Sequence, residues 1–184
     1  IEHMSHLITQ VLLLERFENG NQQLQINKFD PSELVINTIQ RFETMADLKK
    51  VSLKTQISGE IKNIDADPDL LIQVLTNLVS NALKFTSEEG RITILLEQNK
   101  THTKFTVEDN GKGIPDDEQH LLFNKFFQAK NQTLKKPIGS GLGLAICKRI
   151  VELHHGEIHL RSKIDEGTAL SFFIPNFTTE NKLK

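Results

Sequence analysis

Apolar residues recur at intervals of three and four along several stretches of the chain, which is the spacing of one face of an α-helix. Two of these stretches open with Asp-Pro, at Asp30 and at Asp67. The aspartate can cap the first turn, and proline suits the first helical position. The pattern predicts one extra N-terminal helix and three long helices. The N-terminal helix covers 1–19, and the long helices cover 31–50, 68–84 and 142–155.

Between the helices, apolar and polar residues alternate over short stretches, as they do in strands with one buried face. We predict strands at 24–29, 51–57, 64–66, 91–97, 104–108, 157–162 and 168–174, and a short helix at 116–127. Helices and strands follow one another irregularly. This order predicts an α/β chain of the α+β type, a two-layer sandwich in which a mixed β-sheet carries the three long helices on one face.

Composition narrows the class of protein. The 184 residues include 22 Lys and Arg and 24 Asp and Glu, a net charge of −2, so we expect no nucleic-acid partner. Cys147 is the only cysteine and cannot form an internal disulfide. No apolar run approaches the ~18 residues that span a bilayer. We therefore expect a cytoplasmic location and no membrane contact by this part of the protein.

The second long helix carries polar residues beside its apolar stripe. Asn77, Asn81 and Lys84 lie at i, i+4 and i+7 and share one face, while Leu78 and Val79 between them belong to the core stripe. Two amides and an ammonium beside an apolar surface suit a metal ion and phosphate oxygens. The alternative is an ordinary solvent-exposed face, and this segment alone does not separate the two.

Two glycine-rich segments are candidates for ligand contact. Segment 109–115 ends a predicted strand with Asp109, whose carboxylate can accept a hydrogen bond from an adenine amine, and its glycines let the backbone approach a flat ring. Such a segment is also common turn chemistry. Segment 139–144 opens the third long helix, where free backbone N–H groups can bind an anion. It matches neither the Rossmann fingerprint nor a Walker loop.

Three phenylalanines fall within 123–127, directly before a polar and basic stretch at 129–139. Three aromatic residues so close together usually pack in a core. Because these precede a stretch with few apolar anchors, we expect them to anchor a mobile lid over a site.

The four segments occur together and in this order, and the combination resembles the catalytic ATP-binding domain of sensor histidine kinases, within the ATPase group that includes gyrase and the Hsp90 chaperones. The resemblance covers about 30–174. By it, 77–84 is the N box, 109–113 the G1 box, 123–127 the F box and 139–143 the G2 box.

The resemblance implies ATP and Mg²⁺, bound between the long helices under the lid. Asn81 would ligate the magnesium, Asp109 would read the adenine amine, and Thr168 would support the same edge through water. Asn77 and Lys84 would bind the nucleotide and act in catalysis, with Lys84 on phosphate. The other implied nucleotide contacts are Gly111, Gly113, Ile114, Phe126, Gly139, Ser140, Gly141, Leu142 and Gly143.

The same resemblance divides the chain into three parts. Residues 1–20 would end the second helix of a dimerisation hairpin, 21–176 would form the catalytic domain, and 177–184 would be a polar tail. His6 follows a serine, as a phosphoacceptor histidine would, but no acid follows it and only one helix fits between it and the catalytic domain. We therefore expect the acceptor histidine to lie outside this chain.

The implied function is transfer of the ATP γ-phosphoryl group to a histidine of a phosphoacceptor domain, in cis or in trans. A response regulator would be a further partner, and the full-length protein would be a homodimer anchored in the inner or plasma membrane. Gyrase-like and chaperone members carry a glutamate where Asn77 stands; an amide cannot be a general base, so Asn77 favours a kinase over an ATP hydrolase. A nucleotide-binding module without transfer activity and an anti-sigma-type protein-serine kinase remain as alternatives.

Overall fold

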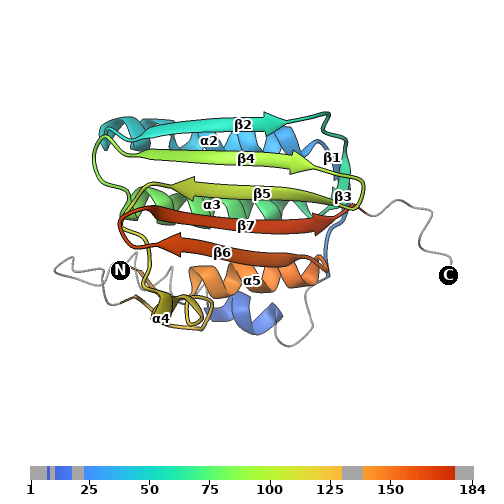
Figure 1. Ribbon diagram of the computed structural model, residues 1–184. Coiled ribbons are helices and arrows are strands. Elements are labelled where there is room, and N and C mark those ends of the chain that lie inside the picture. Colours follow the sequence, from blue (N-terminus) through green and yellow to red (C-terminus); the bar gives the residue numbers. More distant parts are fainter. Residues whose placement is uncertain (1–7, 9–10, 18–22, 130–138, 177–184) are drawn as a thin grey trace.

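A computed structural model describes residues 8, 11–17, 23–129 and 139–176. Its centre is a five-stranded sheet (Figure 1), in which β2 pairs with β4 in parallel and every other pair is antiparallel, as predicted for a mixed sheet. In spatial order the strands are β2 (Ser52–Ser58), β4 (Arg91–Gln98), β5 (His102–Asp109), β7 (Gly167–Pro175) and β6 (Glu157–Lys163).

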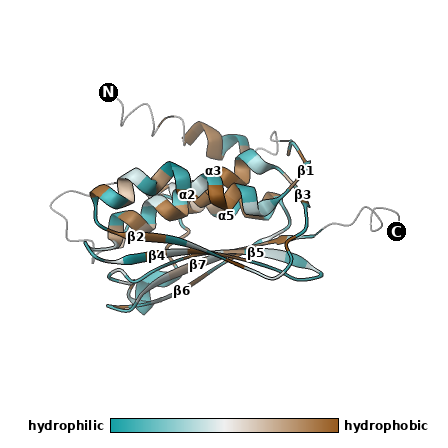
Figure 2. Cartoon of the chain, turned by 90° about the horizontal axis from the view of Figure 1, so that it is seen from above, coloured by the Kyte–Doolittle hydropathy of each residue, from teal (hydrophilic) through white to brown (hydrophobic). Residues whose placement is uncertain are grey.

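Three helices cover one face of this sheet (Figure 2), so the predicted two-layer fold is confirmed. They are α2 (Pro31–Leu48), α3 (Pro68–Phe85) and α5 (Gly143–Leu153). The Asp-Pro starts act as expected, because the Asp30 carboxylate accepts a hydrogen bond from the N–H of Ser32 at 2.7 Å. In the described part of the chain, no helix is long and apolar enough to cross a membrane.

The core lies between these two layers. The apolar stripe of α3 is almost completely buried against the sheet, where Phe105 of β5 and Phe172 of β7 stack with ring centroids 4.7 Å apart. Burial of each such side chain contributes ~1.5–3 kcal/mol. Helix α3 is therefore fixed in the middle of the helical layer, and its polar residues lie beside this buried stripe.

One buried histidine fixes the start of α3 relative to α5. The N–H of Asp67 donates to Nε2 of His154 at 3.0 Å, and Nδ1 of the same ring lies 2.8 Å from the carbonyl of Ile150. Burial lowers the pKa of His154. A neutral ring with its proton on Nδ1 satisfies both contacts, so this imidazole joins the end of α5 to the cap of α3.

A small antiparallel ladder closes the remaining end of the helical layer. It pairs β1 (Asn27–Phe29) with β3 (Ile64–Ala66), so the strand predicted at 24–29 is shorter than expected. Since β3 offers only three residues, the N–H of Gln25 instead donates to the Asp67 carboxylate at 2.9 Å.

The helix predicted at 116–127 is wrong in length. Only α4 (Asp116–Gln119) is helical, and turns follow it. Phe126 has a left-handed φ of 62°, and its N–H donates to the carbonyl of Gly141 at 2.9 Å rather than to a preceding turn.

Other boundaries differ by a few residues. Helix α2 ends at Leu48 rather than at 50, because Lys50 takes a left-handed φ of 55°. Helix α5 begins at Gly143 and ends at Leu153, and His155 beyond it has a φ of 56°.

Residues 11–17 are helical, in agreement with the predicted N-terminal helix where the structure describes it. Leu14 and Phe17 are buried, and the guanidinium of Arg149 on α5 donates to the carbonyl of Phe17 at 3.0 Å. The segment therefore docks on α5. The division at 20 and 176 stays a prediction, and His6 lies outside the described residues.

Candidate functional site

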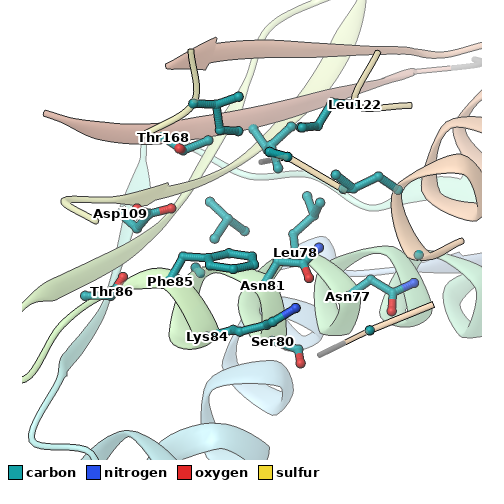
Figure 3. Close-up of a pocket in the computed structure, with 18 of the residues that line it drawn as sticks. Asn77, Leu78, Ser80, Asn81, Lys84, Phe85, Thr86, Asp109, Leu122 and Thr168 are labelled. Atoms are coloured by element: carbon teal, nitrogen blue, oxygen red, sulfur yellow. The ribbon is translucent and has the colours of Figure 1, made fainter. Parts of the chain in front are cut away.

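A cavity of about 670 Å³ opens between α3, the inner face of β5 and β7, and the loops that follow β5 and precede α5 (Figure 3). Most residues singled out in the sequence lie on its wall. They are Asn77, Asn81, Lys84, Asp109, Gly113, Ile114, Gly139, Ser140, Gly141, Gly143 and Thr168. The structure therefore brings the N-box, G1 and G2 segments together around one space.

Helix α3 supplies one wall. Figure 3 shows Asn77, Asn81 and Lys84 along one side of this helix, as their spacing predicted, while Leu78 beside them is buried. Burial lowers the pKa of Lys84, whose ammonium lies 4.6 Å from the centre of the Phe85 ring. This wall presents two amides and one ammonium above an apolar floor.

Asp109 ends β5 and stands across the cavity from α3 (Figure 3). Burial raises the pKa of its carboxyl to about 6, although the backbone N–H groups of Gly111 and Thr168 donate to it and oppose the shift. The Gly111 contact is 2.8 Å long. A carboxylate held by two backbone donors keeps lone pairs for a ligand N–H group.

Thr168 is the register partner of Asp109 on β7. Its hydroxyl lies 2.8 Å from Oγ of Ser162, and that oxygen also accepts a hydrogen bond from the N–H of Ile114 at 2.9 Å. One serine on β6 thereby joins the G1 loop to the end of β7. This end of the cavity is thus built from strands and is rigidly held.

The G2 segment closes the opposite side. A Cβ placed on Gly139 would lie 3.3 Å from Nζ of Lys84, and one on Gly143 would lie 3.7 Å from Oδ1 of Asn77. The N-cap residue of α5, Leu142, makes no side-chain cap hydrogen bond, and Gly143 and Leu144 of the first turn lie on the wall of the cavity. Backbone N–H groups and the Lys84 ammonium suit an anion such as phosphate.

Three predicted contacts do not lie on the wall. Leu142 is fully buried in the core, Gly111 donates its N–H to the Asp109 carboxylate, and Phe126 is 65% exposed. Phe127 takes the expected place of Phe126. Residues 130–138, most of the predicted lid, lie outside the described residues.

The cavity also includes residues that sequence patterns did not single out. Val107 and Leu170 form its apolar floor, and the inward phase of the two predicted strands could have indicated them. Lys49 comes from the end of α2, and no local pattern indicates it.

Cys147 lies under the site and is fully buried. Burial raises the pKa of its thiol to about 12, and the side chain of Asn77 hydrogen-bonds to it, which makes it a packing residue.

Gly113 shows how tightly the G1 loop fits. Its φ is +67°, and a Cβ there would lie 1.9 Å from the carbonyl oxygen of Lys163. We expect Gly113→Ala to lower the free energy of unfolding by about 2–4 kcal/mol, from both strain and backbone displacement. Gly59→Ala is the matched control, because Gly59 has a φ of +83° with nothing within 4 Å of a Cβ; it should lower that free energy by about 1–2 kcal/mol. Urea unfolding of both variants measures the difference, and equal losses would contradict the crowding at Gly113.

The comparisons with known proteins agree with this geometry. The family of histidine kinase-, DNA gyrase B- and HSP90-like ATPases matches residues 66–178. The chain belongs to this family of ATPases. Within it, the circadian input-output histidine kinase CikA of Synechococcus elongatus is 36% identical over 96% of this chain and 24% of its own length. The sensor protein kinase WalK of Staphylococcus haemolyticus is 32% identical over 95% of this chain and 29% of its own length. The chain thus spans less than a third of these two relatives.

Solved structures show the same fold. The catalytic domain of histidine kinase ThkA matches with a TM-score of 0.72 and 29% identity, over 83% of this chain and 96% of that domain. Full-length ShkA in complex with AMPPNP matches with a TM-score of 0.86 and 26% identity, over 96% of this chain and 36% of ShkA. ThkA in complex with the response regulator protein TrrA matches with a TM-score of 0.76 and 27% identity, over 98% of this chain and 50% of ThkA. The described part of this chain therefore has the fold of a histidine kinase catalytic domain.

Proposed function

We propose that this chain binds Mg²⁺-ATP in the cavity beside α3 and supplies the γ-phosphoryl group to a histidine of a separate acceptor helix. The observation that carries the proposal is that one cavity has on its wall both Asp109 and, from α3 and the G2 segment, Lys84 and three glycines, Gly139, Gly141 and Gly143. The acceptor can be in cis or in trans, and we propose a response regulator as the next partner, on the cytoplasmic side of the membrane. ThkA has been solved with a response regulator, which supports that step.

The chemistry of the wall fits the two ends of ATP. An adenine amine needs an acceptor in an otherwise apolar slot, and Asp109 stands above Val107 and Leu170. A triphosphate needs donors and positive charge, which Lys84 and the first turn of α5 offer. The complex of ShkA with AMPPNP supports a nucleotide in this fold.

The donor set also fits magnesium. In the ranges the structure describes, no three His, Cys, Asp or Glu side chains gather as a metal site. Magnesium prefers oxygen ligands and keeps several waters beside phosphate oxygens, so one or two amide oxygens suffice. We propose Asn81 as the ligand, with Asn77 beside it. The ion would neutralise charge on the phosphates.

The transfer forms a bond from an imidazole nitrogen of the acceptor to the γ-phosphorus and breaks the bond to the β–γ bridging oxygen, so that ADP leaves and the ring loses its proton. This chain's residues hold and orient the phosphates. Asn77 cannot take a proton from water, so hydrolysis should stay slow. The relatives named above are histidine kinases, which supports histidine rather than serine as the acceptor.

The proposal has a direct binding test. Calorimetric titration of the chain with AMPPNP in the presence of magnesium should show one site. The absence of heat and of any thermal stabilisation at saturating nucleotide would overturn it. GTP is the control, since its base has a carbonyl where adenine has the amine that Asp109 accepts.

Lower pH should weaken ATP binding and should stabilise the nucleotide-free protein against unfolding. The ionised carboxylate of Asp109 is a stronger acceptor for the amine than the protonated carboxyl group, and its pKa is about 6, so ATP affinity should be up to about tenfold lower at pH 5 than at pH 7.5. Folding raises this pKa from 3.8, so the folded carboxyl holds its proton more tightly, and through this group the free energy of unfolding should rise as pH falls from 6 to 4. Titrations of wild type and Asp109→Asn side by side check this, because the titration of ATP itself is common to both. The same pH dependence in both proteins would contradict it.

A further inference from the structure

Lys84, the cation of the proposed phosphate site, lies in the last turn of α3, where the helix ends in backbone carbonyls. The helix ends at Phe85, and the N–H of Thr86 donates to the carbonyl of Ala82 at 2.9 Å. The carbonyls of Leu83 and Lys84 come after the last helical acceptor and carry the negative end of the helix dipole. A polyphosphate chain next to Lys84 would meet this negative end.

One lysine side chain donates hydrogen bonds to both carbonyls. Lys49 follows α2 directly, and its ammonium donates to the carbonyl oxygen of Leu83 and, at 3.3 Å, to that of Lys84. The same side chain is half-buried and lies on the wall of the cavity with Asn81 and Lys84. Its positive charge is thus held at the end of α3 whose dipole would repel an anion.

We propose that Lys49 is a positioning residue for the phosphate chain of the nucleotide, acting by cancelling the negative end of α3. The inference rests on the proposed binding of ATP. Lys49 lies 34 residues from the nearer of its two carbonyl partners and belongs to none of the four sequence boxes. Its role would be electrostatic, so its effect should grow with the negative charge of the ligand.

This dependence separates the proposal from a structural cap. A residue that only stabilises the helix end would change the affinity for every ligand of the cavity by the same factor. A residue that sets the local potential would leave the neutral adenosine almost unaffected and weaken the binding of ADP and, most strongly, of ATP. Added salt should reduce the difference, because it screens a partly exposed charge.

The experiment compares adenosine, ADP and ATP by calorimetry at fixed magnesium and ionic strength. Lys49→Met removes the charge and the hydrogen bonds, whereas Lys49→Gln removes the charge and keeps a donor for the carbonyls. We expect both variants to weaken ATP binding about 3–10-fold, to weaken ADP binding less, and to leave adenosine within about twofold. Lys50→Met is the matched control, because Lys50 pairs with Glu88 on the surface at 3.3 Å with both side chains 70% exposed. It should leave all three affinities within about twofold.

Each outcome of this experiment either supports or overturns the proposed role of Lys49. An equal loss for adenosine and ATP, or no loss for either in both Lys49 variants, overturns the role of Lys49 while wild-type binding still stands. If Lys49→Met does not fold, Lys49→Gln gives the answer alone. If wild type binds adenosine and ATP equally well, the proposed phosphate site itself falls.

Discussion

Replacing Asp109 by Asn should lower the affinity for ATP about 5–150-fold, because a buried donor of the base would lose its acceptor, at a cost of about 1–3 kcal/mol. The exchange swaps a carboxylate held by two backbone N–H groups for an amide that must also place two donors of its own. Calorimetry with an ATP analogue at neutral pH measures the loss.

The fold should survive this change, which makes the result easy to interpret. A carboxyl whose pKa is raised by burial is unfavourable as a charged group at neutral pH, so the unfolding temperature of Asp109→Asn should not fall. Glu108→Gln is the control: it makes the same chemical change one residue earlier, on the exposed face of β5. Affinity that is unchanged in Asp109→Asn, or lowered equally in both variants, would contradict the adenine role of Asp109.

The chain alone should bind ATP and yet remain unlabelled by γ-labelled ATP. No acid follows His6 to orient or deprotonate its ring, and transfer needs a histidine that can approach the phosphate end of the cavity. Addition of an acceptor hairpin from a related sensor kinase should give acid-labile label on that partner only. Scintillation counting after acid and base treatment distinguishes phosphohistidine from phosphoserine.

Two results would contradict this prediction. Acid-labile label on His6 of the isolated chain would make His6 an acceptor. The assignment of residues 1–20 to the second helix of the hairpin would then be wrong. Acid-stable label on a serine or threonine would favour the protein-serine kinase alternative. Asp109→Asn serves as the control here, because weaker nucleotide binding should reduce labelling of the partner at limiting ATP.

Local chemistry explains what the sequence predicted well. The start of α3 follows from Asp67 and the proline after it, and its site face follows from the spacing of Asn77, Asn81 and Lys84. Caps and periodicity act within a few residues, so one sequence suffices to read them. The starts of α2 and α3 and the inner face of β5 were predictable for the same reason.

Distant contacts account for the errors. Phe126 rather than Phe127 was expected in the cavity. Its left-handed backbone and its hydrogen bond to Gly141, fifteen residues away, could not be read from local spacing. Lys49 was missed because its partners lie on another helix. The mixed sheet was expected, but which strands pair in parallel was not predicted, because the pairing of β2 with β4 depends on packing across the whole sheet.

A second acidic residue, Glu108, directly precedes Asp109 at the end of β5. Asp109 faces the cavity and Glu108 faces solvent, because neighbouring residues of a strand point to opposite sides. A single inserted residue earlier in β5 would move the end of the strand by one position and turn Glu108 inward, opposite Thr168. Such a change in length usually exchanges the two faces of a strand, but here it would still place a carboxylate at the proposed adenine site, on a side chain one methylene longer.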